Sequence, residues 1–241
     1  MTTDRWAHAV RQQVGLGRFL PLGGPRDGAW IAERAAETVL RHAAAHGVPG
    51  VRLGGLRIAL ADPDRTHEPV VPPPPSALPP GALRLTAEFA ATAAQPLPTT
   101  ASRLRTVLAD AAAERIGLSV TEVDLRVTEL LDGEPSPDRT AEPPREPEPR
   151  AAVEPGGSEA ERVAAAVLAV PGVTRLADAP GGPVQLTERP GGAALPRRHA
   201  RVGLAVRTDH RALDVARAVR AAVSEALPDR PTVAVLVAAV D

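Results

Sequence analysis

The stretches "HGVPGVRL" at 46–53 and "LAVPGVTRL" at 168–176 place the same four-residue turn twice in one chain of 241 residues. Each follows a run rich in Ala, Glu, Arg and Val, and each precedes a short apolar segment. Pro and Gly together end a helix, because Pro cannot continue it and Gly accepts the backbone conformation of a helix end. The repeat is either an accident or the trace of two copies of one folding unit.

The segments around both turns agree in order. Each copy opens with Ala-Glu-Arg, at 32–34 and at 160–162, and continues as an amphipathic helix up to its turn. An alternating strand follows in each copy, at 83–89 and at 202–206, then a second helix and a last strand with period-two apolar residues. A composition rich in Ala, Val and Arg imitates repeats, but the agreement in element order favours a duplication.

The expected fold is α+β, with two related two-layer sandwiches, each a small mixed sheet covered by two helices. We expect an N-terminal arm with a short helix, a first lobe with a proline-rich insertion, a disordered proline-rich linker and a second, divergent lobe. Proline-rich stretches donate few backbone hydrogen bonds and bury little surface, so we expect the insertion to be extended and unpacked. These regions are, in order, residues 1–27, 28–131 (with the insertion at 68–81), 132–158 and 159–241.

The last strands of the two lobes differ on one face. The first alternates its apolar residues with Asp124 and Arg126, whereas the second has apolar residues on both faces. A strand that is apolar on both faces is normally covered on both, so we expect the first lobe, a second chain, the N-terminal segment or the strand's own loops to cover it. The candidate partner-binding residues are Trp6, Phe19, Leu20, Ala234, Leu236 and Ala238.

Composition removes much of the usual catalytic chemistry. The chain contains no Cys, Lys or Tyr, so it offers no disulfide, thiolate nucleophile, zinc–thiolate site or Schiff base. No Ser lies in a G-x-S-x-G motif. The net charge of −1 favours neither nucleic acid nor an anionic membrane. We therefore expect no catalytic residues, no cofactor and no metal.

Two groups of residues that include histidine are candidates for a metal site or for acid–base chemistry. His42 and His46 lie four residues apart on a predicted helix, a spacing that suits a metal, but a solvated helix end explains them better without a third ligand. Asp209 and His210 could suggest acid–base chemistry. We instead expect Asp209 to cap the second helix of the second lobe, with His210 in its first turn.

Two glycine patterns leave a nucleic-acid alternative open. Gly15-x-Gly17 follows a predicted helix rather than a strand, which makes a dinucleotide-binding loop a weak interpretation. Gly47-Val-Pro-Gly50 fits the GxxG loop of KH-type domains, although here it leads into a strand. A small arginine-rich RNA-binding protein is therefore the alternative function, and an enzyme that uses isolated His and Asp residues ranks third.

The N-terminus lacks the apolar core of a signal peptide, and no apolar run approaches the roughly 20 residues that span a bilayer. We expect a cytoplasmic chain that meets a membrane only through a partner.

The chain resembles the alkaline shock protein family, also called the envelope stress response family. The resemblance rests on 31–40 with the turn at 48–51, and on "ASRLRTVLADAAAERIGLSVTEVDLRVTEL" at 101–130. Within the latter, Ile116-Gly117-Leu118 and the strand at 120–127 match the family's helix end and its following strand. The second half is similar to a divergent tandem copy, as in some actinobacterial members.

The resemblance implies a small cytosolic protein that gathers at the membrane by binding a membrane-anchored protein and helps to maintain the envelope under stress. It implies no catalytic residue and no cofactor. The expected function is a non-enzymatic scaffold or adaptor that recognises a protein partner and could also self-associate. Recognition is expected at sheet edges, at the apolar face of the second lobe and at the N-terminal arm.

Overall fold

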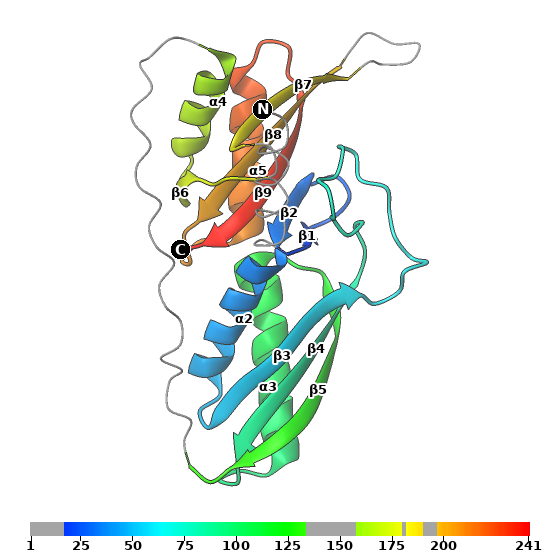
Figure 1. Ribbon diagram of the computed structural model, residues 1–241, viewed down its shortest axis with the longest axis vertical. Helices are drawn as coiled ribbons and strands as arrows, with labels where there is room; N and C mark the ends of the chain where they lie inside the picture. Colours follow the sequence, from blue (N-terminus) through cyan, green and yellow to red (C-terminus); the bar gives the residue numbers. More distant parts are fainter. Residues whose placement is uncertain (1–16, 134–157, 180–181, 190–196) are drawn as a thin grey trace, which may run out of the picture.

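Two mixed β-sheets, each with helices on one side, make up the computed structural model of the chain (Figure 1). The structure describes residues 17–133, 158–179, 182–189 and 197–241. The elements of the first half are β1 (Phe19–Leu22), β2 (Ala29–Ala32), α2 (Glu33–Gly47), β3 (Val51–Leu60), β4 (Leu83–Thr92), α3 (Leu97–Asp110), the π-helical turn η1 (Ala111–Ile116) and β5 (Val120–Leu131). Those of the second half are α4 (Glu159–Leu168), β6 (Val173–Leu176), β7 (Val184–Arg189), β8 (Arg197–Val206), α5 (Ala212–Ala226) and β9 (Thr232–Val240).

The two sheets share one strand topology. In the smaller one, sheet B, the order is β3-β4-β5, with β3 antiparallel and β5 parallel to β4. In sheet A, β6 and β7 pair antiparallel with successive parts of β8, and β9 pairs parallel with β8 on the other side. The elements β6 and β7 together therefore take the place that β3 has in sheet B. The expected α+β class with two small mixed sheets and four helices is confirmed for the described residues.

Both V-P-G-V turns connect a helix to a first strand in the same way. Gly50 and Gly172 have positive φ angles, 77° and 91°, which L-residues with side chains rarely adopt. The carbonyl of Gly50 accepts a hydrogen bond from the amide of Thr92 at 3.0 Å, and that of Gly172 accepts one from Arg207 at 2.9 Å. These two donors close the ends of the equivalent strands β4 and β8. The repeated motif thus occupies equivalent places in both halves.

The helices form where the apolar period predicts them, and their starts differ. Ser158 and Glu161 make a reciprocal capping box at the start of α4, which satisfies two free amide groups of its first turn. The helix α5 begins at Ala212, after Arg211, with no side-chain cap. The prediction that Asp209 caps this helix is wrong: its carboxylate instead contacts Arg207 and His210.

Strands β1 and β2 join sheet A, not the sheet of the first half. The strand β2 runs parallel to β9, with Trp30 beside Leu236, and β1 pairs with β2 on the outside. The sequence assigns residues 29–32 to the first lobe, and the structure places them in the other sheet. Pairing with β9 satisfies the backbone groups of β2 and leaves its own apolar residues, Ala29, Trp30, Ile31 and Ala32, buried. Trp6 and most of the N-terminal arm, in which we expect a short helix, fall in residues 1–16, outside the described residues.

The proline-rich insertion is packed, contrary to expectation. Val71, Pro74 and Pro80 are buried. The amide of Phe19 donates to the carbonyl of Ser76, and the carbonyl of Phe19 accepts from the amide of Leu78. The insertion therefore covers the outer edge of β1. Proline tolerates such an edge position because an edge strand leaves some of its own donors unused. Most of the predicted linker, residues 134–157, lies outside the described residues.

The two sheet units contact one another directly. The amide of Gly23 donates to the carbonyl of Gly117 at 3.0 Å, and Arg211 Nε donates to the carbonyl of Ala113 at 3.0 Å. Leu213 packs over Gly117, which adopts a left-handed conformation at the end of η1. A single cluster of buried apolar side chains runs through both units.

Candidate interaction surface

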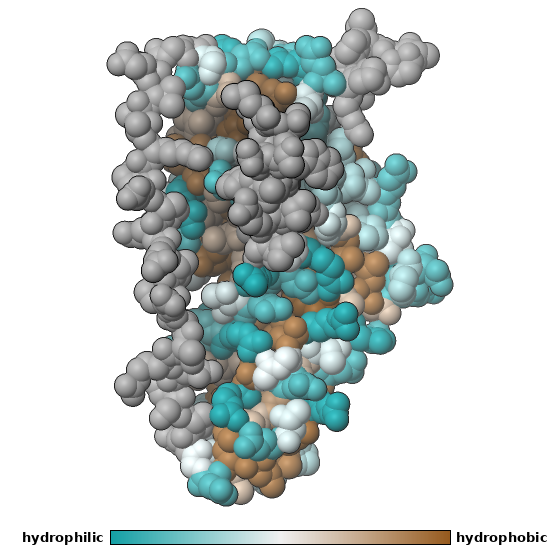
Figure 2. Space-filling view, viewed as in Figure 1, coloured by the Kyte–Doolittle hydropathy of each residue, from teal (hydrophilic) through white to brown (hydrophobic). Residues whose placement is uncertain are grey.

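The face of sheet B that points away from α2 and α3 is open to solvent. In β4, Leu83, Leu85 and Phe89 are fully buried on the helix side, so Arg84 and Glu88 project from the other face. Figure 2 shows hydrophilic residues across the lower half of the molecule, where β3, β4 and β5 face the viewer. The open face, as we call it, consists of Arg52, Arg57, Arg84, Thr86, Glu88, Glu122, Asp124, Arg126 and Glu129.

Opposite charges alternate across the open face. Arg52 Nη2 lies 2.7 Å from Glu129 Oε2, and Arg84 Nε donates to Glu122 Oε2 at 2.7 Å. Looser pairs join Arg84 to Asp124 at 3.7 Å and Arg126 to Glu88 at 3.8 Å. Four arginines and four acidic residues cancel one another in formal charge. Exposed pairs of this kind contribute about 0–1 kcal/mol each, so they are more useful for recognition than for stability.

The predicted partner-binding residues are mostly buried. Phe19, Leu20, Ala234 and Leu236 have no exposed surface, and Ala238 is partly exposed. Phe19 and Leu20 pack within β1, and the two residues of β9 lie in a strand flanked by β2 and β8. In this conformation they cannot contact a partner, apart from Ala238. Strand β2 pairs with the edge of β9, with Trp30 beside Leu236, so it extends the sheet and is not a layer over the face of β9.

In both outer strands of sheet B, backbone carbonyls accept hydrogen bonds from an arginine side chain of a helix. Arg41 of α2 donates from Nη1 to the carbonyl of Leu53 at 3.1 Å and from Nη2 to that of Gly54 at 2.7 Å. Arg105 of α3 donates from Nε to the carbonyl of Val123, in β5, at 3.1 Å. Such charged side chains discourage an unspecific strand from pairing with an edge.

Strand β5 also exposes apolar side chains. Val127 is 39% exposed and Leu130 is 58% exposed, although they pair with Phe89 and Ala91, which are buried in β4. Exposed apolar side chains on an outer strand are typical of a surface that binds another protein chain. The sequence predicted a hydrated face at Asp124 and Arg126, but the charges of β3 and β4 on the same face of the sheet were not predicted. The alternation of Arg84, Thr86 and Glu88 is the signal that could have found them.

The histidine candidates do not form a site. His42 and His46 stack at 4.0 Å between ring centroids on the exposed side of α2. Burial is the main cause of a lowered pKa of His42, with smaller contributions from the neighbouring His46 and Arg115. Within the described part of the chain, no group of three or more His, Asp or Glu residues could hold a metal ion.

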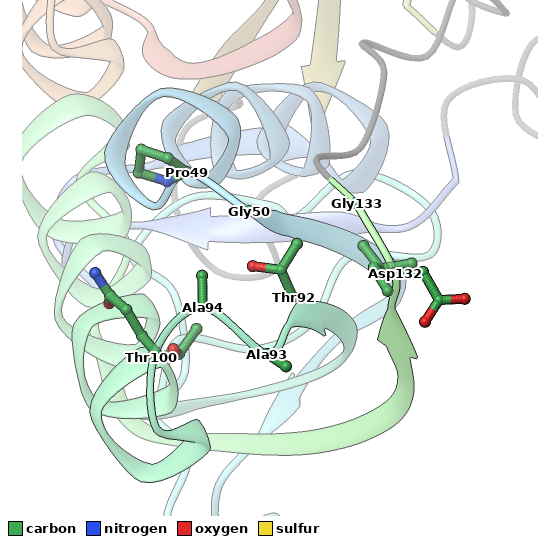
Figure 3. Close-up of a pocket in the computed structure, with 10 residues that line it drawn as sticks. Pro49, Gly50, Thr92, Ala93, Ala94, Thr100, Asp132 and Gly133 are labelled. Atoms are coloured by element: carbon green, nitrogen blue, oxygen red, sulfur yellow. The ribbon is translucent and has the colours of Figure 1, made fainter.

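A cleft of about 530 Å³ lies at the end of sheet B (Figure 3). The first V-P-G-V turn, the loop after β4 and the end of β5 meet there. Thr100 of α3 is buried and donates to the carbonyl of Pro96 at 3.4 Å, and the carboxylate of Asp132 points away from Thr92 and Thr100. Small side chains and main-chain atoms dominate this lining, and no base lies beside a hydroxyl that it could activate.

Among the described residues, no helix is long and apolar enough to cross a bilayer. Comparison with known proteins adds no relative: no family model, no curated protein and no solved structure matches the chain.

Proposed function

We propose that the protein is a non-enzymatic adaptor whose open face binds a protein partner. In line with the resemblance to envelope stress response proteins, the partner is a membrane-anchored protein, and the chain is a cytoplasmic protein that reaches the membrane through it. The two sheet units are divergent copies of one module. In this account the copy with sheet A has become a support and the copy with sheet B has kept the binding surface.

The open face is the observation that supports this function. It presents charges of both signs from three strands, and none of the described helices lies over it (Figure 1). A partner with the complementary pattern gains specificity and association rate from such a surface, because a wrong partner brings like charges together. The shared strand topology and the equivalent bonds of Gly50 and Gly172 support the duplication.

The RNA-binding alternative fits this surface poorly. A sheet that binds RNA stacks bases on aromatic side chains and attracts phosphates with a net positive charge. The open face has no aromatic residue, and its acidic residues offset its arginines. The Gly47–Gly50 turn leads directly into β3 rather than into a second helix.

The function is tested by crosslinking the full chain to membranes and identifying what it captures. The variants Arg57→Glu and Arg84→Glu reverse charges on the open face, and Arg103→Glu on the exposed side of α3 is the matched control. We expect one membrane protein to be captured by the wild type and the control, and to be lost with both face variants. Capture should weaken as salt is raised, because exposed charges are screened.

Two outcomes would contradict the proposal. If both face variants capture the same protein as the wild type, the open face is not the binding surface. If the captured material is nucleic acid whose retention falls steeply with salt, the RNA-binding alternative is correct.

A further inference from the structure

The outer edge of β5 corresponds to an edge that is already paired in the other sheet. Strands β5 and β9 are equivalent, because each follows the second helix of its unit and runs parallel to the central strand. On its other side β9 pairs with β2, whereas β5 ends the strand order of sheet B within the described residues. The fold therefore accepts a further strand at this position.

The other sheet edges are closed. The proline-rich insertion bonds to β1, and the edge formed by β6 and β7 is interrupted between them. Strand β3 has an irregularity between Leu53 and Leu56, near its middle, and carries the two bonds from Arg41, whereas the two irregularities of β5 lie outside its regularly paired residues 122–127. With 12 residues, β5 is the longest outer strand that the structure describes.

We propose that β5 pairs antiparallel with β5 of a second copy of this chain, with Leu125 opposite Leu125 at the two-fold axis. This interaction does not depend on the proposed adaptor function. The pairing would join two copies of sheet B into one continuous sheet, with the two open faces side by side.

The charges of β5 are complementary to themselves in this register. Asp124 faces Arg126 of the second copy, and Arg126 faces its Asp124, so two opposite-charge pairs form across the axis. Both side chains are well exposed in one chain, 63% for Asp124 and 78% for Arg126, and their contacts within the chain are the looser ones. A shift of one residue would place Asp124 opposite Val127 and lose both pairs.

The apolar face agrees with the same register. Val123 faces Val127 of the second copy, which covers a side chain that is 39% exposed in one chain. Val120 likewise faces Leu130, which is 58% exposed. The apolar side chains left open on β5 are therefore the ones that the second copy would bury.

The backbone groups of β5 point the right way. The carbonyl of Val123 accepts from Arg105 of α3, so it faces away from β4. Because the groups of a strand alternate between its two edges, the N–H and C=O of residues 123, 125 and 127 face the free edge. Pairing requires Arg105, an exposed side chain, to release the carbonyl of Val123, which a backbone amide of the second copy then replaces.

Charge reversal tests the dimer, measured by sedimentation equilibrium of the full chain. Asp124→Arg places like charges opposite one another in both pairs, and so does Arg126→Asp, so each variant alone should dimerise about tenfold more weakly than the wild type. An equal mixture of the two variants restores both pairs and should dimerise as well as the wild type. Circular dichroism checks that both fold, which their exposure favours.

A single cysteine gives a second, independent readout, because the natural chain has none. In Leu125→Cys, the two cysteines of the dimer face each other with their Cα atoms about 5.5 Å apart, a distance that a disulfide can span. Mild oxidation should link this variant into a covalent dimer and leave Arg57→Cys, on β3, monomeric. A wild type that stays monomeric up to about 1 mM, a mixture no better than the single variants, or linking that is equal at both cysteines would each overturn the proposal.

Discussion

Strands β6 to β9 of sheet A are arranged like the three strands of sheet B, but the last strand of each set has opposite surroundings. In sheet A, β9 lies between two strands, and Val233–Val237 are buried on both faces. In sheet B, β5 is an outer strand, and Thr121, Asp124 and Arg126 are exposed. The order and direction of the strands therefore do not decide which surface of either sheet meets solvent. Exposure is decided by the residues that alternate with the apolar positions of β9 and β5.

The side chains at equivalent positions explain the contrast. Ala234 and Leu236 take the positions that Asp124 and Arg126 have in β5. Apolar residues there favour burial of both faces of the strand, and sheet A continues beyond β9 with β2 and β1. Charged residues there keep the face of β5 hydrated, which leaves it available to a partner.

Exchange of side chains between these equivalent positions should have the largest effect. Leu236→Arg puts a charge without a partner where the side chain has no exposed surface, and we expect the free energy of unfolding to fall by more than about 4 kcal/mol. The reciprocal Arg126→Leu, on the exposed strand, should change it by less than about 0.5 kcal/mol. Urea unfolding of both variants measures the difference. Equal, small effects would mean that this face of β9 is open in solution.

The sequence allowed the common topology to be predicted because its cues are local. The Gly in each V-P-G-V turn needs a positive φ, the apolar periods distinguish helix from strand, and Gly117 marks the helix end before β5. The position of β2 could not be predicted this way. Its four residues read equally well as the start of the first helix, and only the distant Leu236 explains their burial.

The open face was predicted only in part. The alternation of Asp124 and Arg126 indicated a wet face, but the ladder from Arg84 to Glu122 depends on the register of β4 against β5, which includes two irregularities. The burial of the proline-rich insertion was missed for a similar reason. Its prolines exclude a central strand but are compatible with a position at a sheet edge. Only the structure shows that β1 is such an edge and that the insertion bonds to it.

The contact between the two sheets is tested at Gly117. A Cβ at this position would overlap Leu213 of α5, and its φ of 99° disfavours any L side chain. We expect Gly117→Ala to lower the free energy of unfolding by about 2–3 kcal/mol, because both the packing and the backbone are strained. Gly133→Ala is the control, since a Cβ there meets no atom within 4 Å. If thermal unfolding shows equal losses, the two sheets do not pack at this point.

The attachment of β1 and β2 to sheet A is tested at Asp27, in the turn between them. Its carboxylate accepts from Arg217 Nε at 2.8 Å and from the amide of Gly24 at 2.7 Å. Burial opposes its ionisation, but these hydrogen bonds and the charges of Arg217 and Arg220 outweigh it, so the pKa of Asp27 lies below its usual value. We expect Asp27→Asn to cost about 1 kcal/mol at neutral pH.

The pH dependence of this effect has a defined sign. Because the pKa of Asp27 is lower in the folded chain, its contribution is present above the unfolded value of about 3.9 and is lost as the pH falls toward the folded pKa. The difference in unfolding free energy between wild type and Asp27→Asn should therefore shrink below about pH 4. Asp64→Asn, on an exposed loop, serves as the control. A constant difference from pH 3 to 7 would contradict this role of the ion pair.

The smallest expected effect concerns the arginines at the two edges of sheet B. Removing Arg105 frees the carbonyl of Val123, so Arg105→Ala should strengthen the proposed dimer a few-fold, while the free energy of unfolding changes by about 1 kcal/mol or less. Arg41→Ala frees carbonyls of β3, where the irregularity next to Leu53 prevents regular pairing, and should leave dimerisation unchanged. Sedimentation equilibrium of both variants separates the two edges. Equal strengthening would mean that any freed edge associates, whereas strengthening with Arg105→Ala alone ties self-association to β5, the strand whose counterpart in sheet A already has its neighbour.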